Sequence, residues 1–212
     1  KEMQTMDYGI PLAYARTARF EEDRLKGQID NTISLGVVYE LFAKGFQGTA
    51  ILATEEEIGK SWMHIRSYLE TYAIETQNLI VLDTSPYSTN PEAIENGHII
   101  FRNRDMSEEF NPELVKALKV RAKDLGLDYQ VKDETMLKAG KQIAQLGSTE
   151  LGRLVKNTNG HWNGATVQIP TLMYHTSNET TTTKAIDNYF KFLNNILIED
   201  KLSLLEGRKA EA

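Results

Sequence analysis

The sequence predicts a three-layer α/β/α sandwich built on a mixed, mostly parallel sheet. Short apolar runs of strand length alternate with longer segments in which apolar residues recur three or four positions apart. This alternation is typical of a parallel sheet with helices on both faces. The chain has 212 residues and is 41% hydrophobic, which is enough for one substantial core.

The first half of the chain supplies three of the expected apolar runs and two helices. Residues 1–29 are expected to hold one or two strands with a polar turn, since 10–15 is extended and 20–26 is charged. They are followed by a helix at 31–44, a buried strand at 48–53, a helix at 61–72 and a buried strand at 79–83. Gly45 ends the first helix. The second helix is expected to turn Trp62, Ile65, Leu69 and Tyr72 inward.

The second half continues the same alternation. The elements are a strand at 98–102, a helix at 111–125, a short strand at 129–131, a helical stretch at 136–156 broken at 147–152, a turn-rich loop at 157–164, a strand at 165–169, and a last helix that the polar run 178–183 opens. Gly126 ends the helix at 111–125. The tail after residue 206 is polar and expected to fray.

Charge and composition exclude several classes of partner. The net charge is −6, from 24 basic and 30 acidic residues, and the pI is about 5.3. Without a basic patch, neither nucleic acid nor an anionic membrane is an expected partner. No cysteine is present, so a metal ion must use His, Asp or Glu. No run of eighteen apolar residues or signal-peptide pattern occurs, which predicts a soluble, cytoplasmic protein.

Three successive carboxylates follow the apolar run at 48–53. Glu55, Glu56 and Glu57 stand just before Gly59. Strand ends of an open α/β sheet are where such folds bind ligands. Grouped carboxylates repel one another and lose hydration unless a cation or a proton relieves them. The alternative is a solvated acidic turn whose glutamates favour the N-terminus of the next helix.

Other candidate ligands fall at comparable positions. Asp30 precedes a helix, Asp83 follows a strand, and His175 follows another, so all can meet Glu56 and Glu57 at one rim of the sheet. Zinc, cobalt and manganese accept such a donor set. Each residue also has an ordinary structural interpretation, as a helix cap, a turn cap or a hydrogen-bonded histidine.

Several short segments resemble one family in order and spacing. They are Asp30-Asn31, Thr-Glu-Glu-Glu-Ile-Gly at 54–59, Ile-Val-Leu-Asp at 80–83, Pro170-Thr171 with His175, and Glu179. Together they resemble the dinuclear metallo-aminopeptidases of the glutamyl-aminopeptidase and tetrahedral-aminopeptidase type, over roughly residues 26 to 195. The segment 147–152 is similar to that family's Gly-Gly-Thr-Asp-Ala-Gly loop, with Glu150 in place of Asp.

The resemblance implies a zinc-peptidase-like fold and a role for each residue. Asp30 would bridge two ions, Glu57 and His175 would complete one shell, and Asp83 would belong to the other. Glu56 would be the general base, and Glu150 would recognise a substrate amine. The implied cofactor is one or two ions of zinc or cobalt, the substrate is a short peptide with a free N-terminus, and the implied assembly is a homo-oligomer.

The chain also departs from the family pattern. The family takes a further ligand from a His-x-Asp motif well before Asp30, and no histidine precedes Asp30 here. At most one tightly held ion is therefore expected. Thr32, Ser61-Trp62 and Leu172-Met173 also differ from the family. A catalytically inactive relative that serves as a binding or assembly module stays open, as does a related metal-dependent deacylase.

The expected division of the chain has three parts. Residues 1–29 form a strand segment at the edge of the domain, residues 30–198 form the metallopeptidase catalytic domain, and residues 199–212 form a C-terminal tail.

Overall fold

A computed structural model describes residues 18–87 and 91–202 of the chain. The central sheet has the strand order β3-β6-β4-β5. Its strands are β3 (Leu79–Pro86), β4 (Ile99–Phe101), β5 (Tyr129–Val131) and β6 (Gly164–Thr171). β3 is parallel to β6 and β4 is parallel to β5, whereas β4 and β6 are antiparallel. The mixed, mostly parallel sheet expected from the sequence is therefore confirmed.

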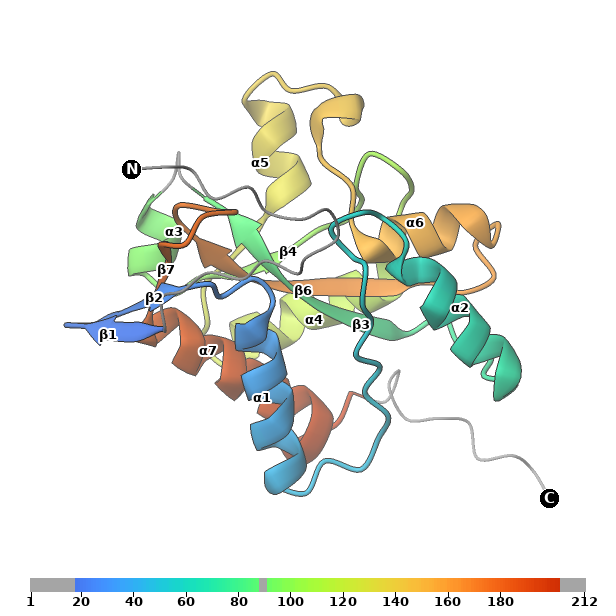
Figure 1. The fold of residues 1–212 in the computed structure, drawn as a ribbon, viewed down its shortest axis with the longest axis horizontal. Coiled ribbons are helices and arrows are strands. Elements are labelled where there is room, and N and C mark those ends of the chain that lie inside the picture. The colour runs from blue at the N-terminus through green and yellow to red at the C-terminus, as the bar shows by residue number, and fades with distance from the viewer. Residues whose placement is uncertain (1–17, 88–90, 203–212) are drawn as a thin grey trace, which may run out of the picture.

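Helices cover both faces of this sheet. They are α1 (Thr32–Ala43), α2 (Ser61–Thr71), α3 (Pro91–Glu95), α4 (Pro112–Asp124), α5 (Lys132–Lys138), α6 (Glu150–Asn157) and α7 (Thr183–Asn194), with a 3-10 turn η1 (Ile143–Gln145) and a π-helical turn η2 (Asn195–Glu199). α1 and α7 lie on one side of the sheet and α6 on the other, whereas α5 continues directly from the end of β5 and stands apart from the sheet (Figure 1). No helix in the described ranges is long and apolar enough to cross a bilayer.

The main core forms where helix faces meet the middle of the sheet. Phe101 of β4 contacts Phe192 of α7, with ring centroids 5.5 Å apart, and both side chains are fully buried. Val167 of β6 and Leu114 of α4 belong to the same cluster. The predicted helices α1, α2, α4 and α7 are all confirmed. The apolar spacing of α1 and α2 places Val37, Leu41, Ile65 and Leu69 in the interior, although Phe42 near the end of α1 is 43% exposed.

A second, antiparallel sheet was only partly foreseen. β1 (Arg19–Glu21), β2 (Arg24–Gly27) and β7 (Glu179–Thr182) pair in the order β1-β2-β7. The strands β1 and β2 fall within the predicted segment. The expectation that the polar run 178–183 opens the last helix is confirmed, because α7 begins at Thr183 and the Thr182 hydroxyl caps it by accepting from the N–H of Ala185 at 3.1 Å. The sequence did not predict that residues 179–182 also form a buried strand. Its threonines lack an apolar period but have β-branched side chains, which suit a strand.

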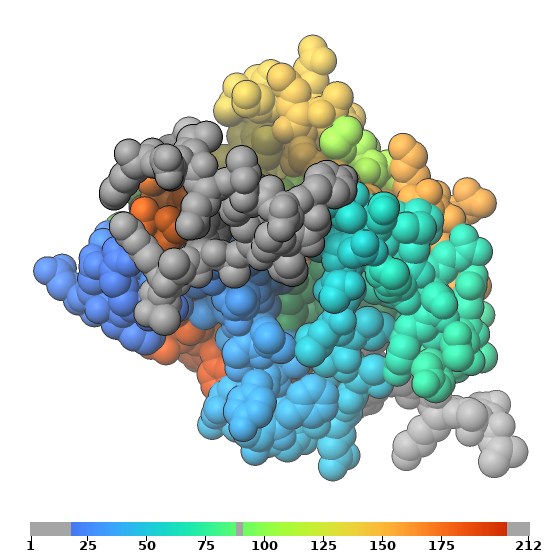
Figure 2. All heavy atoms as spheres, in the orientation of Figure 1, coloured from blue at the N-terminus to red at the C-terminus, as the bar shows by residue number. Residues whose placement is uncertain are grey.

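The expected strand at residues 48–53 is also wrong. This segment is irregular, and Leu52 is 66% exposed. Ile51 and Ala53 instead pack on a small cluster with Leu69 and Trp162. The segment crosses the surface between α1 and α2 (Figure 2). An apolar run becomes a strand only if a neighbouring strand accepts its backbone hydrogen bonds, and among described residues β3 pairs with β6 alone.

Three smaller expectations also need comment. The helical stretch at 136–156 begins earlier, at Lys132, and is divided into α5, η1 and α6. On α2, Ile65 and Leu69 are buried as expected, but Tyr72 is 63% exposed because the helix ends at Thr71. The extended segment at 10–15 and the tail after 206 lie outside the described residues.

Candidate metal centre and adjoining cavity

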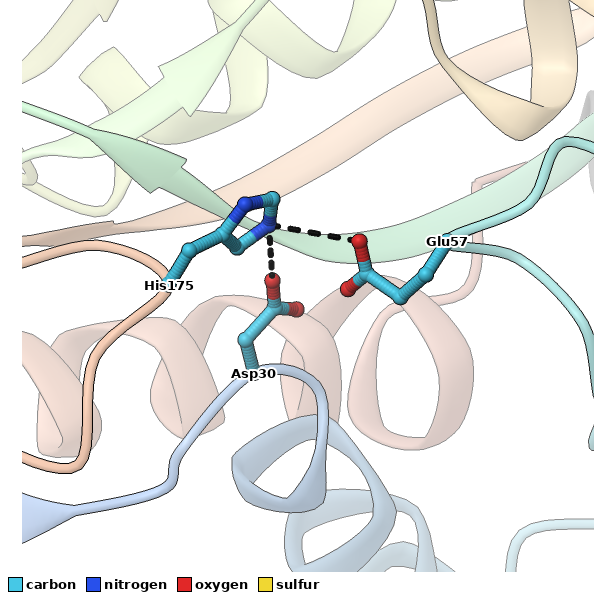
Figure 3. Close-up of side chains that lie close together, drawn as sticks. All are labelled: Asp30, Glu57 and His175. Atoms are coloured by element: carbon cyan, nitrogen blue, oxygen red, sulfur yellow. Dashed lines mark ion pairs between the residues drawn. The ribbon is translucent and has the colours of Figure 1, made fainter. Parts of the chain in front are cut away.

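Three of the predicted ligands come together. Asp30 lies between β2 and α1, Glu57 in the turn before α2, and His175 in the loop between β6 and β7. His175 Nε2 is 3.4 Å from Asp30 Oδ2 and 3.3 Å from Glu57 Oε2 (Figure 3). Each residue offers one possible ligand atom, and these three atoms all lie within 4.8 Å of one another. The group combines half-buried Asp30, whose side chain is 8% exposed, with exposed Glu57 and exposed His175.

The donor set and its spacing suit a divalent ion. Catalytic zinc sites use three protein ligands from His, Asp and Glu and leave one position for water. Cobalt and manganese accept the same donors. Asp30 and Glu57 carry like charges close together, and a bound cation would relieve their repulsion. These residues therefore fit a single metal ion, and their role as ligands stays a prediction.

Buried Glu179 holds two ligand-bearing segments in place. Its Oε2 accepts the backbone N–H groups of Ile29 and Asp30, both at 2.8 Å. Its Oε1 accepts the N–H of His175, also at 2.8 Å. Glu179 is 2% exposed, so these hydrogen bonds replace its hydration. Since Glu179 belongs to β7, the missed strand is the element that connects Asp30 with His175.

The loop that carries His175 has an unusual backbone. The backbone angle φ is 58° at His175 and 53° at Met173 in the same loop. Residues other than glycine rarely adopt this region, and such strain gathers at functional sites. Tyr174 stacks on His175, with ring centroids 4.0 Å apart. Burial, and to a lesser extent the negative charge of Asp30, raises the pKa of the Tyr174 hydroxyl.

Glu56, the predicted general base, lies in the same acidic turn. Its Oε1 is 3.3 Å from Nη1 of Arg153 on α6, and its backbone carbonyl also accepts from that group at 3.2 Å. Burial raises the pKa of Glu56 above its usual value, and the carboxylates of Glu57 and Asp30 add to this effect, whereas Arg153 opposes it. The side chain lines the cavity beside the metal group.

Asp83 lies near the group of three but outside it. It belongs to β3, and its oxygens accept the N–H of Thr84 at 2.8 Å and the side-chain amide of Gln168 at 3.1 Å. Burial, followed by the negative charge of Asp30, raises the pKa of Asp83 to about 7. Its predicted role in a second metal shell stays a prediction.

The raised pKa of Asp83 gives a testable pH dependence in the metal-free protein. In the unfolded chain this carboxyl titrates near ~4, so between about pH 4 and 7 the folded state retains a proton that the unfolded state has lost. The free energy of unfolding of the wild type should therefore decrease as the pH rises from 4 to 7. Asp83→Asn has no carboxyl to ionise at this position, so it should not show that decrease. Above pH 7 it should be more stable than the wild type by about 1–3 kcal/mol.

Urea unfolding from pH 4 to 8 measures this difference. Asp124→Asn, at the exposed end of α4, is the matched control and should follow the wild type. A stability difference between Asp83→Asn and wild type that stays constant with pH would contradict the prediction.

A cavity of about 590 Å³ extends from the metal group over the sheet. Glu56, Glu57, Asp83 and His175 line one part of it. Glu150, predicted to bind a substrate amine, is not among its lining residues, although its neighbours Thr149 and Arg153 are. Glu150 occupies the first turn of α6, where burial raises its pKa and Ser61 and Arg153 oppose that rise.

Sequence reasoning missed several residues of this cavity. Tyr174, Arg102, Lys132 and Gln168 all line it. Tyr174 could have been found by its position beside His175. Arg102 directly follows β4, Gln168 lies in β6 and Lys132 begins α5, and none of these three belongs to a sequence motif. The remaining histidines lie elsewhere: His64 contacts Glu55, His98 contacts Gln130 and His161 contacts Glu75.

Comparisons with known proteins support the fold. No family model matches the sequence, and no curated protein matches it. Solved structures do match. They include PhTET1-12s, a dodecamer (TM-score 0.65, 12% identity), the aminopeptidase APDkam598 from the archaeon Desulfurococcus kamchatkensis (0.66, 14%), and a TET aminopeptidase from a marine sediment archaeon of the Thaumarchaeota (0.65, 18%).

The matches cover most of this chain but only part of the other proteins. They span 87%, 88% and 87% of this chain and 54%, 52% and 52% of the matched chains, respectively. The chain thus spans about half the length of these structures. It has the α/β fold that these aminopeptidases share, and function must be argued from the site itself.

Proposed function

We propose that this chain is the catalytic part of a metal-dependent aminopeptidase that removes N-terminal residues from short peptides. The observation that carries this proposal is the group Asp30, Glu57 and His175, within reach of one ion beside a cavity. The aminopeptidase fold of the neighbours supports it. Zinc and cobalt are the proposed ions. The proposed reaction, hydrolysis of the N-terminal peptide bond, is taken from the sequence resemblance to the dinuclear aminopeptidases.

The chain's own residues suit hydrolysis in which water attacks a peptide carbonyl. Asp30, Glu57 and His175 would hold the ion, which supplies Lewis acidity and a water of lowered pKa when bound. Glu56 accepts the proton from the attacking water, since its pKa is raised and it faces the same cavity. Arg153 fixes the orientation of Glu56. Glu179 keeps Asp30 and His175 at a constant separation.

Metal content tests the centre directly. After exposure to zinc or cobalt and desalting, the wild type should retain one ion per chain, because only one complete donor group is present among the described residues. His175→Ala should lose it, with affinity reduced by at least about tenfold. His161→Ala, whose ring contacts Glu75 away from the group, should retain the ion.

Elemental analysis by mass spectrometry gives the number of ions. Absence of a bound ion in the wild type, or an ion retained in His175→Ala, would contradict the centre. Two tightly held ions would contradict the single-ion prediction and would require a substitute for the family's upstream histidine.

A catalytically inactive relative that acts as a binding or assembly module is the second candidate. The Glu56–Arg153 ion pair favours it, because a guanidinium at the proposed base competes for the oxygen that must accept a proton. A metal-bound protein without peptidase or deacylase activity would favour this candidate.

The remaining proposals concern the whole protein. A homo-oligomer is proposed by analogy with the dodecameric PhTET1-12s. A cytoplasmic location and the chain divisions at residues 30 and 198 are likewise proposals.

A further inference from the structure

A fully buried carboxylate lies behind the wall of the cavity and is not used by the proposed reaction. Asp105 belongs to the turn between β4 and α4, and the residue is 0% exposed. A buried carboxylate is costly unless hydrogen bonds replace its hydration. The donors that surround Asp105 therefore identify the segments that it holds in place.

Asp105 accepts hydrogen bonds from two segments that are distant in the sequence. Its Oδ1 accepts the N–H groups of Ser107 at 2.6 Å and Glu108 at 3.1 Å, which belong to the same turn. Its Oδ2 accepts the N–H of Thr149 at 2.7 Å and the hydroxyl of the same residue at 2.9 Å. The turn is thus joined to the loop 147–149, whose three residues all line the cavity.

Thr149 passes this constraint on to α6. Thr149 is the N-cap of the helix, and its hydroxyl accepts the N–H of Gly152 at 3.1 Å while it donates to Asp105. Gly152 approaches the carboxylate so closely that a Cβ atom there would lie 2.1 Å from Asp105 Oδ2. Hydrogen bonds and close contact together therefore fix the first turn of α6 against Asp105.

The same helix carries Arg153, which contacts the proposed general base. Arg153 Nη1 donates to Glu56 Oε1 at 3.3 Å and to the Glu56 carbonyl at 3.2 Å. The guanidinium also packs on the acidic turn, since a Cβ atom at Gly59 would lie 3.1 Å from Arg153 Cζ. Within that turn, the N–H of Gly59 donates to the carbonyl of Glu56 at 2.7 Å, and the N–H of Lys60 donates to that of Glu55 at 3.0 Å. A shift of α6 would therefore be passed to Glu56 by Arg153.

We propose that Asp105 is a positioning residue that holds Glu56 in place through Thr149, α6 and Arg153. This inference rests on the proposed function for the role of Glu56 as the base, whereas the chain of contacts does not depend on it. Asp105 does not line the cavity itself. It acts as support of the kind that keeps a catalytic group in its productive geometry.

Hydrogen exchange of the 212-residue, metal-free protein, followed by mass spectrometry, tests this coupling. In Asp105→Asn, an amide replaces the carboxylate and sets an NH2 group against N–H donors. Peptides that cover residues 55–60 and 147–153 should then exchange about tenfold or more faster than in the wild type. A purely structural role would instead accelerate only segments that exchange through global unfolding, such as α7, and leave 55–60 unchanged.

A double-mutant cycle shows whether the effect passes through Arg153. Arg153→Met removes the guanidinium, so it should by itself accelerate exchange at residues 55–60. Asp105→Asn added to this variant should change exchange at 55–60 by less than about twofold, because the connection is already broken. Exchange at 147–153 should still become faster.

Two substitutions of Thr149 test the same connection without altering the buried carboxylate. Thr149→Val keeps the shape of the side chain but lacks the hydroxyl, so it should also accelerate exchange at 55–60. Thr149→Ser keeps the hydroxyl and should exchange like the wild type. Thr158→Val is the matched control, since the Thr158 hydroxyl donates to the carbonyl of Leu154 at the other end of α6.

Kinetics of the metal-loaded protein add a second readout. Thr149→Val should lower kcat for an aminoacyl substrate by about tenfold and leave KM within about twofold, because the base is displaced while the binding cavity remains. Thr149→Ser should restore kcat.

Three results would overturn the proposal. They are unchanged exchange at 55–60 in both Asp105→Asn and Thr149→Val, an effect of Asp105→Asn that persists in full in Arg153→Met, and an active wild type whose kcat is unchanged in Thr149→Val. Preserved coupling in a protein that hydrolyses no aminoacyl substrate would remove the peptidase proposal and leave the positioning of Glu56 by Asp105 intact.

Discussion

Replacing Glu56 by glutamine is expected to lower kcat for hydrolysis of an N-terminal aminoacyl substrate by about 10²–10⁴-fold, with little change in KM. Glutamine has nearly the same shape and can still contact Arg153, but it cannot accept a proton from water. A loss confined to kcat would mean that Glu56 acts in the transition state rather than in substrate binding. Steady-state kinetics with the metal-loaded protein measures both constants.

Glu55→Gln is the matched control for this variant. Glu55 lies in the same turn, but its side chain contacts His64 at 2.9 Å instead of Arg153 and does not line the cavity. Its kcat should equal that of the wild type. If Glu56→Gln retains full activity, or if both variants lose activity equally, Glu56 is not the general base.

Truncation of Glu179 is expected to have the largest effect on stability. Glu179→Ala removes the acceptor of three backbone N–H groups, from Ile29, Asp30 and His175. Unsatisfied donors cost about 1–3 kcal/mol each when buried, and partial access of water reduces that sum. We therefore expect a loss of about 2–4 kcal/mol in the free energy of unfolding, measured by urea denaturation.

The same variant should also weaken metal binding, although Glu179 does not touch the proposed ion. The segments with Asp30 and His175 would no longer be held at a fixed separation, and support of this kind is worth about 10–100-fold in metal affinity. Thr180→Ala, the next residue of β7, is the control, because its hydroxyl donates to the carbonyl of Asn178. Unchanged metal affinity in folded Glu179→Ala would reduce Glu179 to a purely structural residue.

The sequence alone determined the regular elements with strong local patterns. The helices α1, α2 and α7 follow from apolar spacing, because one face of each must be buried whatever it packs against, and α4 follows from its boundary residues, Gly126 among them. The strands β3 and β6 follow from short apolar runs, of which β6 is buried inside the sheet and β3 is half-buried at the end of the described sheet. The candidate ligands Asp30, Glu57 and His175 also follow from the sequence, because they stand at the ends of such elements and because their segments resemble one family.

Only the tertiary structure decided which of these residues meet. Asp30, Glu57 and His175 come from three loops that are distant in the sequence. Glu179 holds the segments of Asp30 and His175 together, and its strand has no apolar period to reveal it. The apolar run at 48–53 found no strand to pair with, and no local pattern reports that. Burial of Asp105 likewise depends on long-range packing, since the same carboxylate on an exposed surface would be solvated and would need no hydrogen bonds from Thr149.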